Sequence, residues 1–306
     1  MSSIVIGGGT AGLTIAARLA AYPSTSVAVI EAGGFYEQDN GNYSVLPGLS
    51  LSSPFLAATE VFPQNPLMDW GLVSVPQAGA LNRKIHYAQG KTLSGSSALN
   101  AMAYHRANKG AYDRWADMVG DQSYTFNNIL PYFEKSCHFS PPNESKRQTP
   151  NATVRYDPKT FSFTGGPLQV SYSNWVDVAL TWFQRAFTNI GLPVSEIGFN
   201  SGSIAGKSAW ITSTIDPTVG ERSSSQSSFL RQAIQDTNII VYTQAQASKI
   251  LFNGTTASGV AVTTQGVNYT ISADKEVILS AGVYHSPQIL MISGRLFPQQ
   301  FIQLKS

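Results

Sequence analysis

The chain has 306 residues, of which 42% are hydrophobic and 12% are charged, and this length suits one large or two ordinary globular domains. Twenty Lys and Arg against 18 Asp and Glu leave a formal net charge of +2, so the charge balance gives no reason to expect nucleic acid as a partner. The composition excludes a disordered chain, a collagen and, with one cysteine, a disulfide scaffold.

The start of the chain carries no targeting pattern. Met1-Ser2-Ser3 leads directly into the apolar run Ile4-Val5-Ile6, without the charged and apolar regions of a signal peptide. No apolar run reaches the roughly 18 residues that a membrane span needs. We therefore expect no export signal and no membrane span in this chain, and we leave its location and oligomeric state open. Cys137 is interpreted as a small buried hydrophobe, and no metal site is expected.

The first thirty residues have the pattern of a βαβ unit. Two β-branched runs, Ile4-Val5-Ile6 and Val27-Ala28-Val29-Ile30, predict buried strands. Between them Leu13, Ala16, Ala17 and Ala20 recur at helical spacing, which predicts a helix that lies close to a sheet and ends at Tyr22-Pro23-Ser24.

Three glycines follow the first strand in G-x-G-x-x-G spacing. Gly7 permits the tight turn, Gly9 lets a pyrophosphate approach the backbone, and Gly12 lets the helix pack on the strand. The helix N-terminus then offers free N–H groups and partial positive charge to phosphates. Glu31 ends the second strand and can accept a hydrogen bond from a ribose 2′-OH, which argues against NADP. The unit predicts dinucleotide binding but does not separate FAD from NAD.

A second block rich in small residues runs Gln89-Gly90-Lys91-Thr92-Leu93-Ser94-Gly95-Ser96-Ser97-Ala98-Leu99-Asn100-Ala101-Met102-Ala103-Tyr104 and continues to Asp113-Arg114-Trp115. Such a stretch suits close approach to a flat or anionic ligand, and a flexible surface loop is the alternative. Here the sequence resembles the glucose-methanol-choline (GMC) family of FAD-dependent alcohol oxidases and dehydrogenases. The family shows Gly-Lys-x-Leu-Gly-Gly-Ser-Ser-x-x-Asn at this point, followed by an Asp-x-Trp segment.

The middle of the chain alternates short strands with one long helix. Runs at 69–75 and 167–172 predict strands, which by resemblance begin a substrate-domain sheet. Val176, Ala179, Leu180, Phe183, Phe187 and Ile190 fall on one helical face, interpreted as core. A serine run at 223–228 precedes Phe229 and is expected to cap a short helix, with a disordered linker as the alternative. From 239 to 281 short β-rich runs are broken at Asn253-Gly254 and Gln265-Gly266.

A third segment that matches the family runs from Ser280 to Gly294. The residues predict a buried strand over 275–281, an N-cap at Ser286, Pro287 at the first helical position and a stop at Gly294. The three family segments occur in the right order. The resemblance therefore covers essentially the whole chain up to Gly294.

The resemblance implies an α/β fold, α+β overall, with a Rossmann-like FAD-binding domain and an incomplete antiparallel-sheet substrate domain. The FAD-binding domain is expected over 1–155 and 230–306, interrupted by a strand at about 69–82, and the partial substrate domain over 156–229. The segment matched to the ADP part of FAD supplies Gly7, Gly9, Thr10, Ala11, Gly12, Glu31 and Ala32 as candidate residues. The segment matched to the flavin supplies Asn100, Ala101, Met102 and Ala103. Ala247 is matched to the adenine, and Ala281 lies in another segment close to the cofactor.

Several positions depart from the family pattern. Leu99 stands where some relatives attach FAD covalently through a histidine, so the cofactor is expected to be non-covalent. Ser94 replaces the first glycine of the usual pair, where a side chain can crowd the backbone. After Gly294 the chain reads Arg295-Leu296-Phe297-Pro298 instead of the family's Ile-Gly-Pro, and we expect an N-terminal portion that ends in an unrelated tail.

The reaction of the family transfers a hydride from an alcohol carbon to flavin N5 while a histidine takes the hydroxyl proton. By resemblance that histidine lies beyond residue 306, and His86, His105, His138 and His285 match no catalytic position. We therefore expect an FAD-dependent oxidoreductase scaffold acting on small alcohols, weakly active or inactive as this chain. The alternatives are a non-redox GMC-like cyclase, a non-catalytic fragment, and an NAD-dependent dehydrogenase, which the second and third segments disfavour.

Overall fold

The computed structural model describes residues 1–50 and 65–295, which form two compact units. The first unit comprises Met1–Ala101 and Ser224–Ser306, and the second comprises Met102–Ser223. The tail predicted after Gly294 lies outside the described residues from 296 onward. The assignment of 156–229 to a substrate domain stays a prediction.

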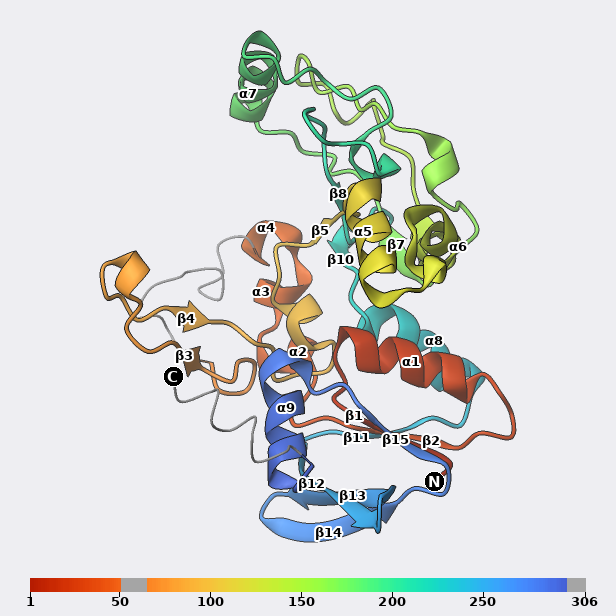
Figure 1. Ribbon diagram of the computed structural model, residues 1–306. Helices are drawn as coiled ribbons and strands as arrows, with labels where there is room; N and C mark the ends of the chain where they lie inside the picture. The colour runs from red at the N-terminus through yellow and green to blue at the C-terminus, as the bar shows by residue number, and fades with distance from the viewer. Residues whose placement is uncertain (51–64, 296–306) are drawn as a thin grey trace. The chain divides into compact units, whose positions relative to one another are not determined.

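The first unit is built on a parallel sheet with strand order β11-β2-β1-β15 (Figure 1). Its strands are β1 (Ser3–Ile6), β2 (Val27–Ile30), β11 (Ile240–Tyr242) and β15 (Glu276–Leu279). Helix α1 (Thr10–Ala20) connects β1 to β2, which pair in parallel with Ser3 opposite Val27. The predicted βαβ unit is confirmed, because a parallel pair requires a crossover and α1 supplies it.

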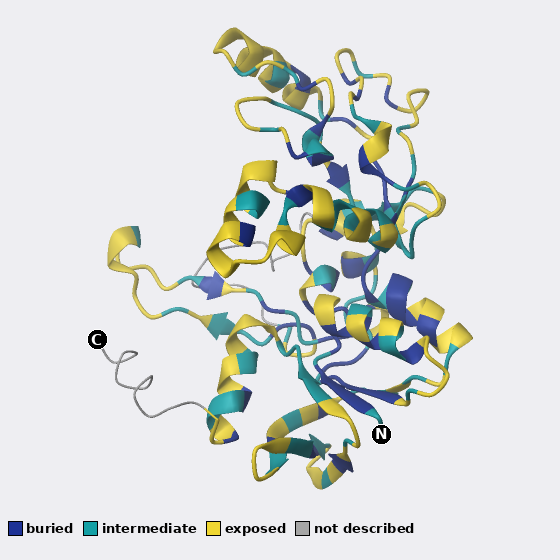
Figure 2. Ribbon diagram, turned by 45° about the vertical axis from the view of Figure 1, so that its right-hand side comes forward, coloured by how far each residue is buried: buried dark blue, intermediate teal, exposed yellow. Residues whose placement is uncertain are grey.

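Alternate residues of β1 and β2 face two different layers. Val5, Val27 and Val29 pack with Leu13 and Ala16 of α1 in one cluster. Because side chains alternate along a strand, Ile4, Ile6, Ala28 and Ile30 face the other way, into a cluster with Ile250, Val260 and Val262. Both faces of the sheet are therefore covered, which explains why these strands read as continuous apolar runs rather than alternating ones (Figure 2).

A three-stranded antiparallel sheet covers the second face. It consists of β12 (Ala245–Asn253), β13 (Thr256–Thr264) and β14 (Val267–Ser272) in that order. The predicted breaks form its two hairpin turns: Gly254 has φ +59°, and Gln265 and Gly266 have φ +49° and +81°. Two successive positive φ values match the primed turns that suit the twist of a hairpin.

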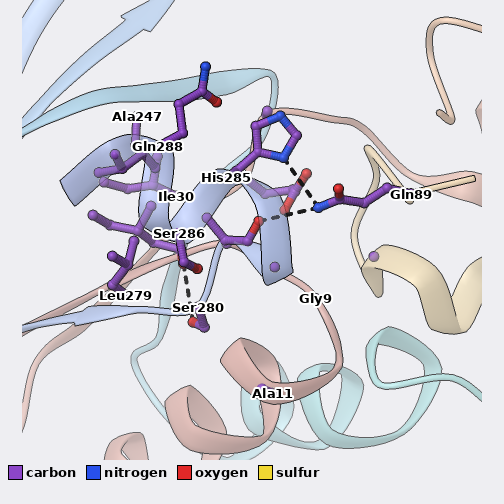
Figure 3. A pocket seen from close by; sticks show the side chains of 18 of the residues that line it. Gly9, Ala11, Ile30, Gln89, Ala247, Leu279, Ser280, His285, Ser286 and Gln288 are labelled. Atoms are coloured by element: carbon purple, nitrogen blue, oxygen red, sulfur yellow. Dashed lines mark hydrogen bonds between the residues drawn. The ribbon is translucent and has the colours of Figure 1, made fainter. Parts of the chain in front are cut away.

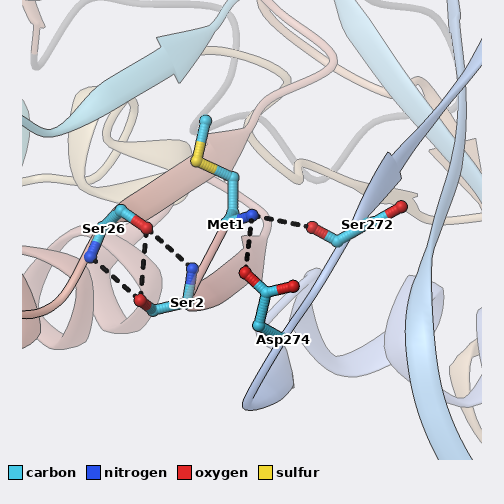
Figure 4. A network of polar contacts seen from close by, with 5 residues as sticks. All are labelled: Met1, Ser2, Ser26, Ser272 and Asp274. Carbon is cyan, nitrogen blue, oxygen red and sulfur yellow. Dashed lines mark hydrogen bonds and ion pairs between the residues drawn. The ribbon is translucent and has the colours of Figure 1, made fainter.

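The start of β1 is tied to the end of this sheet. The Met1 ammonium donates to the Ser272 carbonyl at 3.1 Å and lies 3.4 Å from Asp274 Oδ2 (Figure 4). Ser2 N donates to Ser26 Oγ at 2.8 Å, which joins β1 to the residue before β2. These contacts fix the register of β1 between its neighbours.

Helices complete the first unit. The serine run leads into a π-helical turn at Gln226–Leu230 and then α8 (Arg231–Asp236), so this segment is a helix rather than a linker. The remaining helices are α2 (Tyr36–Asp39), α3 (Asn42–Val45), α4 (Pro47–Ser50) and α9 (Gly282–Ile292). The strand predicted over 69–75 is reduced to β3 (Leu72–Val73), which pairs with β4 (His86–Tyr87).

The predicted start of the last helix is wrong. Helix α9 begins at Gly282 with Ala281 as its N-cap, so Ser286 and Pro287 lie inside it. The backbone N–H and the hydroxyl of Ser280 both donate to the Ile6 carbonyl, which ends β15 against β1. Gly282, with φ +84°, then turns the chain into a helix at once. Pro287 resembles a helix start in sequence because it lacks the N–H that a helix interior uses.

The second unit contains three α-helices and short paired strands. The helices are α5 (Lys109–Val119), α6 (Phe126–Ser136) and α7 (Val178–Asn189). The strand pairs are β5 (Ala103–Tyr104) with β8 (Thr212–Ser213), β6 (Cys137–Phe139) with β7 (Leu168–Val170), and β9 (Ile215–Asp216) with β10 (Glu221–Arg222). Its core contains Cys137, Phe139, Phe161 and Tyr172, so the interpretation of Cys137 as a buried hydrophobe is confirmed.

The expectation that the aromatic face of α7 is core is wrong. Among the described residues Phe183 is 57% exposed, Phe187 41% and Leu180 49%. The helical residue that is buried is Thr181, at 3%, which lies on the polar side of the helix. Hydrophobic periodicity shows which face of a helix is apolar but not what covers it. Helix α7 therefore presents an apolar surface that the described chain leaves open.

This surface should bind a hydrophobic dye. We expect the double variant Phe183→Gln, Phe187→Gln to lower the fluorescence of added 8-anilinonaphthalene-1-sulfonate at least about twofold, because two large exposed rings are removed. Gln184→Ala, on the polar side, is the control and should leave the signal unchanged. Equal dye fluorescence in the double variant and the unaltered chain would show that the dye-binding surface lies elsewhere.

Candidate cofactor site

A cavity of about 760 Å³ opens at the carboxyl ends of the parallel strands in the first unit (Figure 3). In an α/β sheet this edge is where ligands bind. Its walls include the ends of β1, β2 and β15, the starts of α1 and β12, α9, and the second glycine-serine block. Ile30, Ala247 and Ile289 give it an apolar floor, whereas Glu31, Gln89 and His285 give it polar edges.

The opening glycine turn is shaped by close backbone contacts. A Cβ on Gly12 would lie 1.9 Å from the Gly7 carbonyl oxygen, and a Cβ on Gly7 would lie 2.4 Å from the Ser280 carbonyl oxygen. Gly7 also has φ +99°, a conformation that L side chains rarely adopt. A Cβ on Gly9 would find its nearest neighbour at 3.7 Å, so the backbone there stays open to the cavity. The roles expected for these glycines fit this geometry.

The start of α1 faces this opening. Its N-cap is Gly9, which provides no side-chain hydrogen bond to the free amides, and Thr10 and Ala11 line the cavity. The first N–H groups of a helix are unsatisfied within it and carry partial positive charge. A phosphate group at this end would supply acceptors, so the chain's own residues fit the pyrophosphate of a dinucleotide.

Glu31 lies at the end of β2 with its carboxylate held by the backbone. Oε2 accepts from Gly8 N at 2.8 Å and Oε1 accepts from Gly33 N at 2.9 Å. The residue is 6% exposed, and burial raises the pKa of its carboxyl to about 7, against the lowering effect of those hydrogen bonds and of the Lys91 charge. A ligand hydroxyl that donated to this carboxylate would favour its ionised form.

The candidate residues divide into two groups. Gly7, Gly9, Thr10, Ala11, Glu31, Ala32, Ala247 and Ala281 line the cavity, and Gly12 packs directly beneath it. Asn100, Ala101, Met102 and Ala103 are not among the lining residues. The chain passes from the first compact unit to the second between Ala101 and Met102, and Ala103 pairs with Ser213 in the second unit. A role for these four residues at a flavin stays a prediction.

Ser94 is held by hydrogen bonds in a conformation that glycine usually adopts. Its φ is +84°, and it is fully buried. Its hydroxyl donates to Ser224 Oγ at 2.7 Å and accepts from Gln226 N at 2.8 Å. The side chain therefore does not crowd the turn, because it links the second glycine-serine block to the serine run.

Removing the Ser94 hydroxyl should lower the free energy of unfolding, and more in Ser94→Ala than in Ser94→Gly. Ser94→Ala keeps the strained φ at a fully buried position and leaves the part-buried Gln226 N–H without its acceptor, so we expect a loss of about 2 kcal/mol in the free energy of unfolding. Ser94→Gly loses the same bonds but relieves strain worth about 1 kcal/mol, so it should lose less. Urea unfolding of both variants measures the order. Equal or reversed losses would contradict this description.

Three cavity-lining residues were missed by the sequence analysis. Trp70, Gln89 and His285 converge from three segments, and the rings of Trp70 and His285 lie 4.2 Å apart between centroids. His285 matches no catalytic position of the family, yet it lines the cavity. His86 does have a structural partner, because its Nε2 lies 2.7 Å from Asp69 Oδ2 and both side chains are buried. No periodicity connects positions 70, 89 and 285, so only the fold brings them together.

The described residues form neither a metal-binding cluster nor a membrane-spanning helix. Over 1–50 and 65–295 no group of three or more His, Cys, Asp or Glu side chains is arranged to hold a metal ion. No helix in the same described ranges has the length and apolar character for a membrane crossing.

Comparison with known proteins identifies the scaffold. The family model described as GMC oxidoreductase matches residues 1–296. Patulin synthase of Aspergillus clavatus is 51% identical over 292 residues, which are 95% of this chain and 46% of that protein. Versicolorin B synthase of Aspergillus parasiticus is 46% identical over 293 residues, 95% of this chain and 45% of that protein.

A solved structure agrees with these matches. An FAD-dependent oxidoreductase from Chaetomium thermophilum superposes with a TM-score of 0.84 at 32% identity, covering 96% of this chain and 47% of that one. The α/β fold expected from the resemblance is confirmed, and the chain spans about half the length of the curated relatives it matches. Family model, relatives and fold agree, and the chain belongs to the GMC oxidoreductase family.

Proposed function

We propose that this chain binds FAD non-covalently and forms the cofactor-binding part of an oxidoreductase that acts on CH–OH groups. The observation that carries the proposal is the convergence, on one cavity, of the open glycine turn, the uncapped start of α1 and the Glu31 carboxylate. These three features supply a close backbone approach, phosphate acceptance and ribose recognition, which a dinucleotide needs together.

Non-covalent attachment is supported by the residue at position 99. Leu99 is 5% exposed and packs with Tyr36, Met68 and Ala98. A leucine side chain offers no nucleophile for attachment to a flavin. FAD would therefore be held by the contacts of the cavity and released when the chain unfolds.

The residues of this chain would bind and orient the cofactor rather than move the substrate proton. FAD, when bound, would supply the acceptor for a hydride from the alcohol carbon. The hydroxyl proton needs a base within hydrogen-bond reach. Of the four histidines, all within the described residues, only His285 lines the cavity, and its Nδ1 is held by Gln89. We therefore expect the 306-residue chain to oxidise alcohols weakly or not at all.

A stopped-flow experiment tests this proposal. The chain is reconstituted with FAD, mixed anaerobically with benzyl alcohol and with short aliphatic alcohols, and followed by the flavin absorbance. We expect the absorbance of bound oxidised flavin to persist over minutes. Rapid loss of the oxidised-flavin absorbance on mixing with these alcohols would contradict the proposal, because it would place an effective base among these residues.

A second candidate function is a non-redox cyclisation on the same scaffold. It is favoured by the similarity to patulin synthase and versicolorin B synthase, two proteins named for the product that they form. In that case the flavin would stay oxidised while a metabolite was converted. Product analysis by mass spectrometry beside the flavin spectrum separates the two functions.

A further inference from the structure

The side chain of His285 is fixed on two sides within the cavity wall. Gln89 Nε2 lies 3.2 Å from His285 Nδ1 and 3.5 Å from the Ala281 carbonyl oxygen (Figure 3). Because an amide NH₂ can only donate, Nδ1 is the acceptor and the ring proton lies on Nε2. Trp70 packs against the ring at 4.2 Å between centroids with a 37° angle between planes.

Gln89 is itself held from two further directions. Its backbone N–H donates to Asp69 Oδ1 at 3.0 Å, and the other carboxylate oxygen of Asp69 lies 2.7 Å from His86 Nε2. Its side chain is closed in by α9, because a Cβ on Gly282 would lie 2.5 Å from Gln89 Nε2. The residue is 8% exposed. The buried Asp69–His86 pair therefore fixes Gln89, and Gln89 fixes the tautomer of His285.

The other ring nitrogen of His285 is left as a donor. Among the described residues Nε2 has no hydrogen-bond partner in the protein, and His285 lines the cavity. Burial lowers the pKa of the imidazole, so the ring is neutral near pH 7 and carries one N–H. A donor held in this way suits a ligand atom that accepts a hydrogen bond.

The surroundings of His285 match the adenosine end of a dinucleotide. Helix α9 packs on β12 through Ile289 and Ile250, and Ala247 of β12 lines the same cavity. On the other side Lys91 Nζ lies 5.2 Å from the centroid of the Trp70 ring. The charge of Lys91 also lowers the pKa of the Glu31 carboxyl, where a ribose is expected. A flat base attached to that ribose would meet the apolar floor and the Trp70–His285 wall.

We propose that His285 selects adenine as the base of the bound dinucleotide by donating from Nε2 to a ring nitrogen of the base, with Gln89 as the positioning residue. The inference rests on the proposed binding of FAD. Adenine carries a bare acceptor at N1, whereas hypoxanthine and guanine carry an N–H there. A donor that met an N–H would leave two donors facing each other with no acceptor between them, which weakens binding.

Calorimetric titration with ADP and with inosine 5′-diphosphate tests the assignment without any catalytic readout. We expect the unaltered chain to bind ADP at least about tenfold more tightly, the free-energy equivalent of one hydrogen bond. His285→Phe, which keeps a stacking ring, should bring the ratio close to one. Gln89→Leu should reduce the ratio partially by freeing the tautomer. Gln288→Ala removes an amide from an exposed position in the same cavity and should keep the full ratio.

The outcomes separate this inference from the proposed function. If FAD binds but the unaltered chain holds the two diphosphates equally, or if His285→Phe keeps the full ratio, the assignment of His285 is overturned while FAD binding stands. If neither FAD nor ADP binds to a folded chain, the proposed function itself is wrong. Circular dichroism of each variant shows whether it is folded.

Discussion

Gly12→Ala should unfold or strongly destabilise the first unit and abolish FAD binding. The added Cβ would lie 1.9 Å from the Gly7 carbonyl oxygen and 2.9 Å from Ser280 Oγ. The first contact is with backbone, which cannot rotate away as a side chain can, so α1 would have to move off β1. We expect a loss of about 3 kcal/mol or more in the free energy of unfolding, the cost of a severe overpacking change. Thermal unfolding and FAD titration measure both effects.

Gly110→Ala is the matched control for this variant. Gly110 lies in helix α5, and a Cβ there would meet nothing within 4 Å. Because alanine loses less backbone freedom than glycine on folding, this change should stabilise the chain by about 0.5 kcal/mol. A Gly12→Ala chain with unaltered melting temperature and unaltered FAD affinity would show that α1 does not pack as described.

Glu31→Gln should weaken FAD binding and change how stability depends on pH. A hydrogen bond to a charged group contributes about 1.5–3 kcal/mol, so loss of the carboxylate should weaken FAD binding roughly tenfold to a hundredfold near pH 8. In the unaltered chain a ribose hydroxyl would donate to the ionised carboxylate. FAD affinity should therefore rise as the pH increases through about 7, the pKa of Glu31. Fluorescence titration at several pH values measures this rise.

The stability of the chain without FAD depends on pH in the opposite direction from its affinity for FAD. The pKa of Glu31 is raised on folding from 4.5 to about 7, so between these values the folded chain binds more protons than the unfolded one. Stability should then fall as the pH rises through this window, with a slope of up to about 1.4 kcal/mol per pH unit. Glu31→Gln removes this component, whereas Glu221→Gln, at an exposed position, should not. Parallel stability curves for Glu31→Gln and the unaltered chain would contradict the burial of the carboxylate.

Local chemistry explains which parts of the fold could be predicted from the sequence. In the opening unit the β-branched runs form buried strands, and Gly12 is needed where its backbone touches that of Gly7, five residues earlier. The hairpins at Asn253-Gly254 and Gln265-Gly266 follow from turn conformations that glycine favours. The lining of the cavity by Gly9, Glu31 and Ala247 agrees with positions placed by family resemblance, although the role of each stays a prediction.

Other features depend on contacts between segments distant in the chain. Ser280 stops β15 through the Ile6 carbonyl, 274 residues away, so the true start of α9 has no local signal. The sequence of helix α7 shows an apolar face, but a local pattern does not show whether another segment covers that face. Trp70, Gln89 and His285 meet because the segment before β3, the second glycine-serine block and α9 line one cavity. A histidine at such a position has no sequence signature until the fold supplies its neighbours.

Reconstitution with FAD followed by gel filtration tests the central claim most directly. We expect the folded 306-residue chain to elute yellow with close to one flavin per chain, and acid precipitation to release all of the flavin into solution. A folded chain, shown by circular dichroism, that elutes colourless after incubation with excess FAD would contradict it.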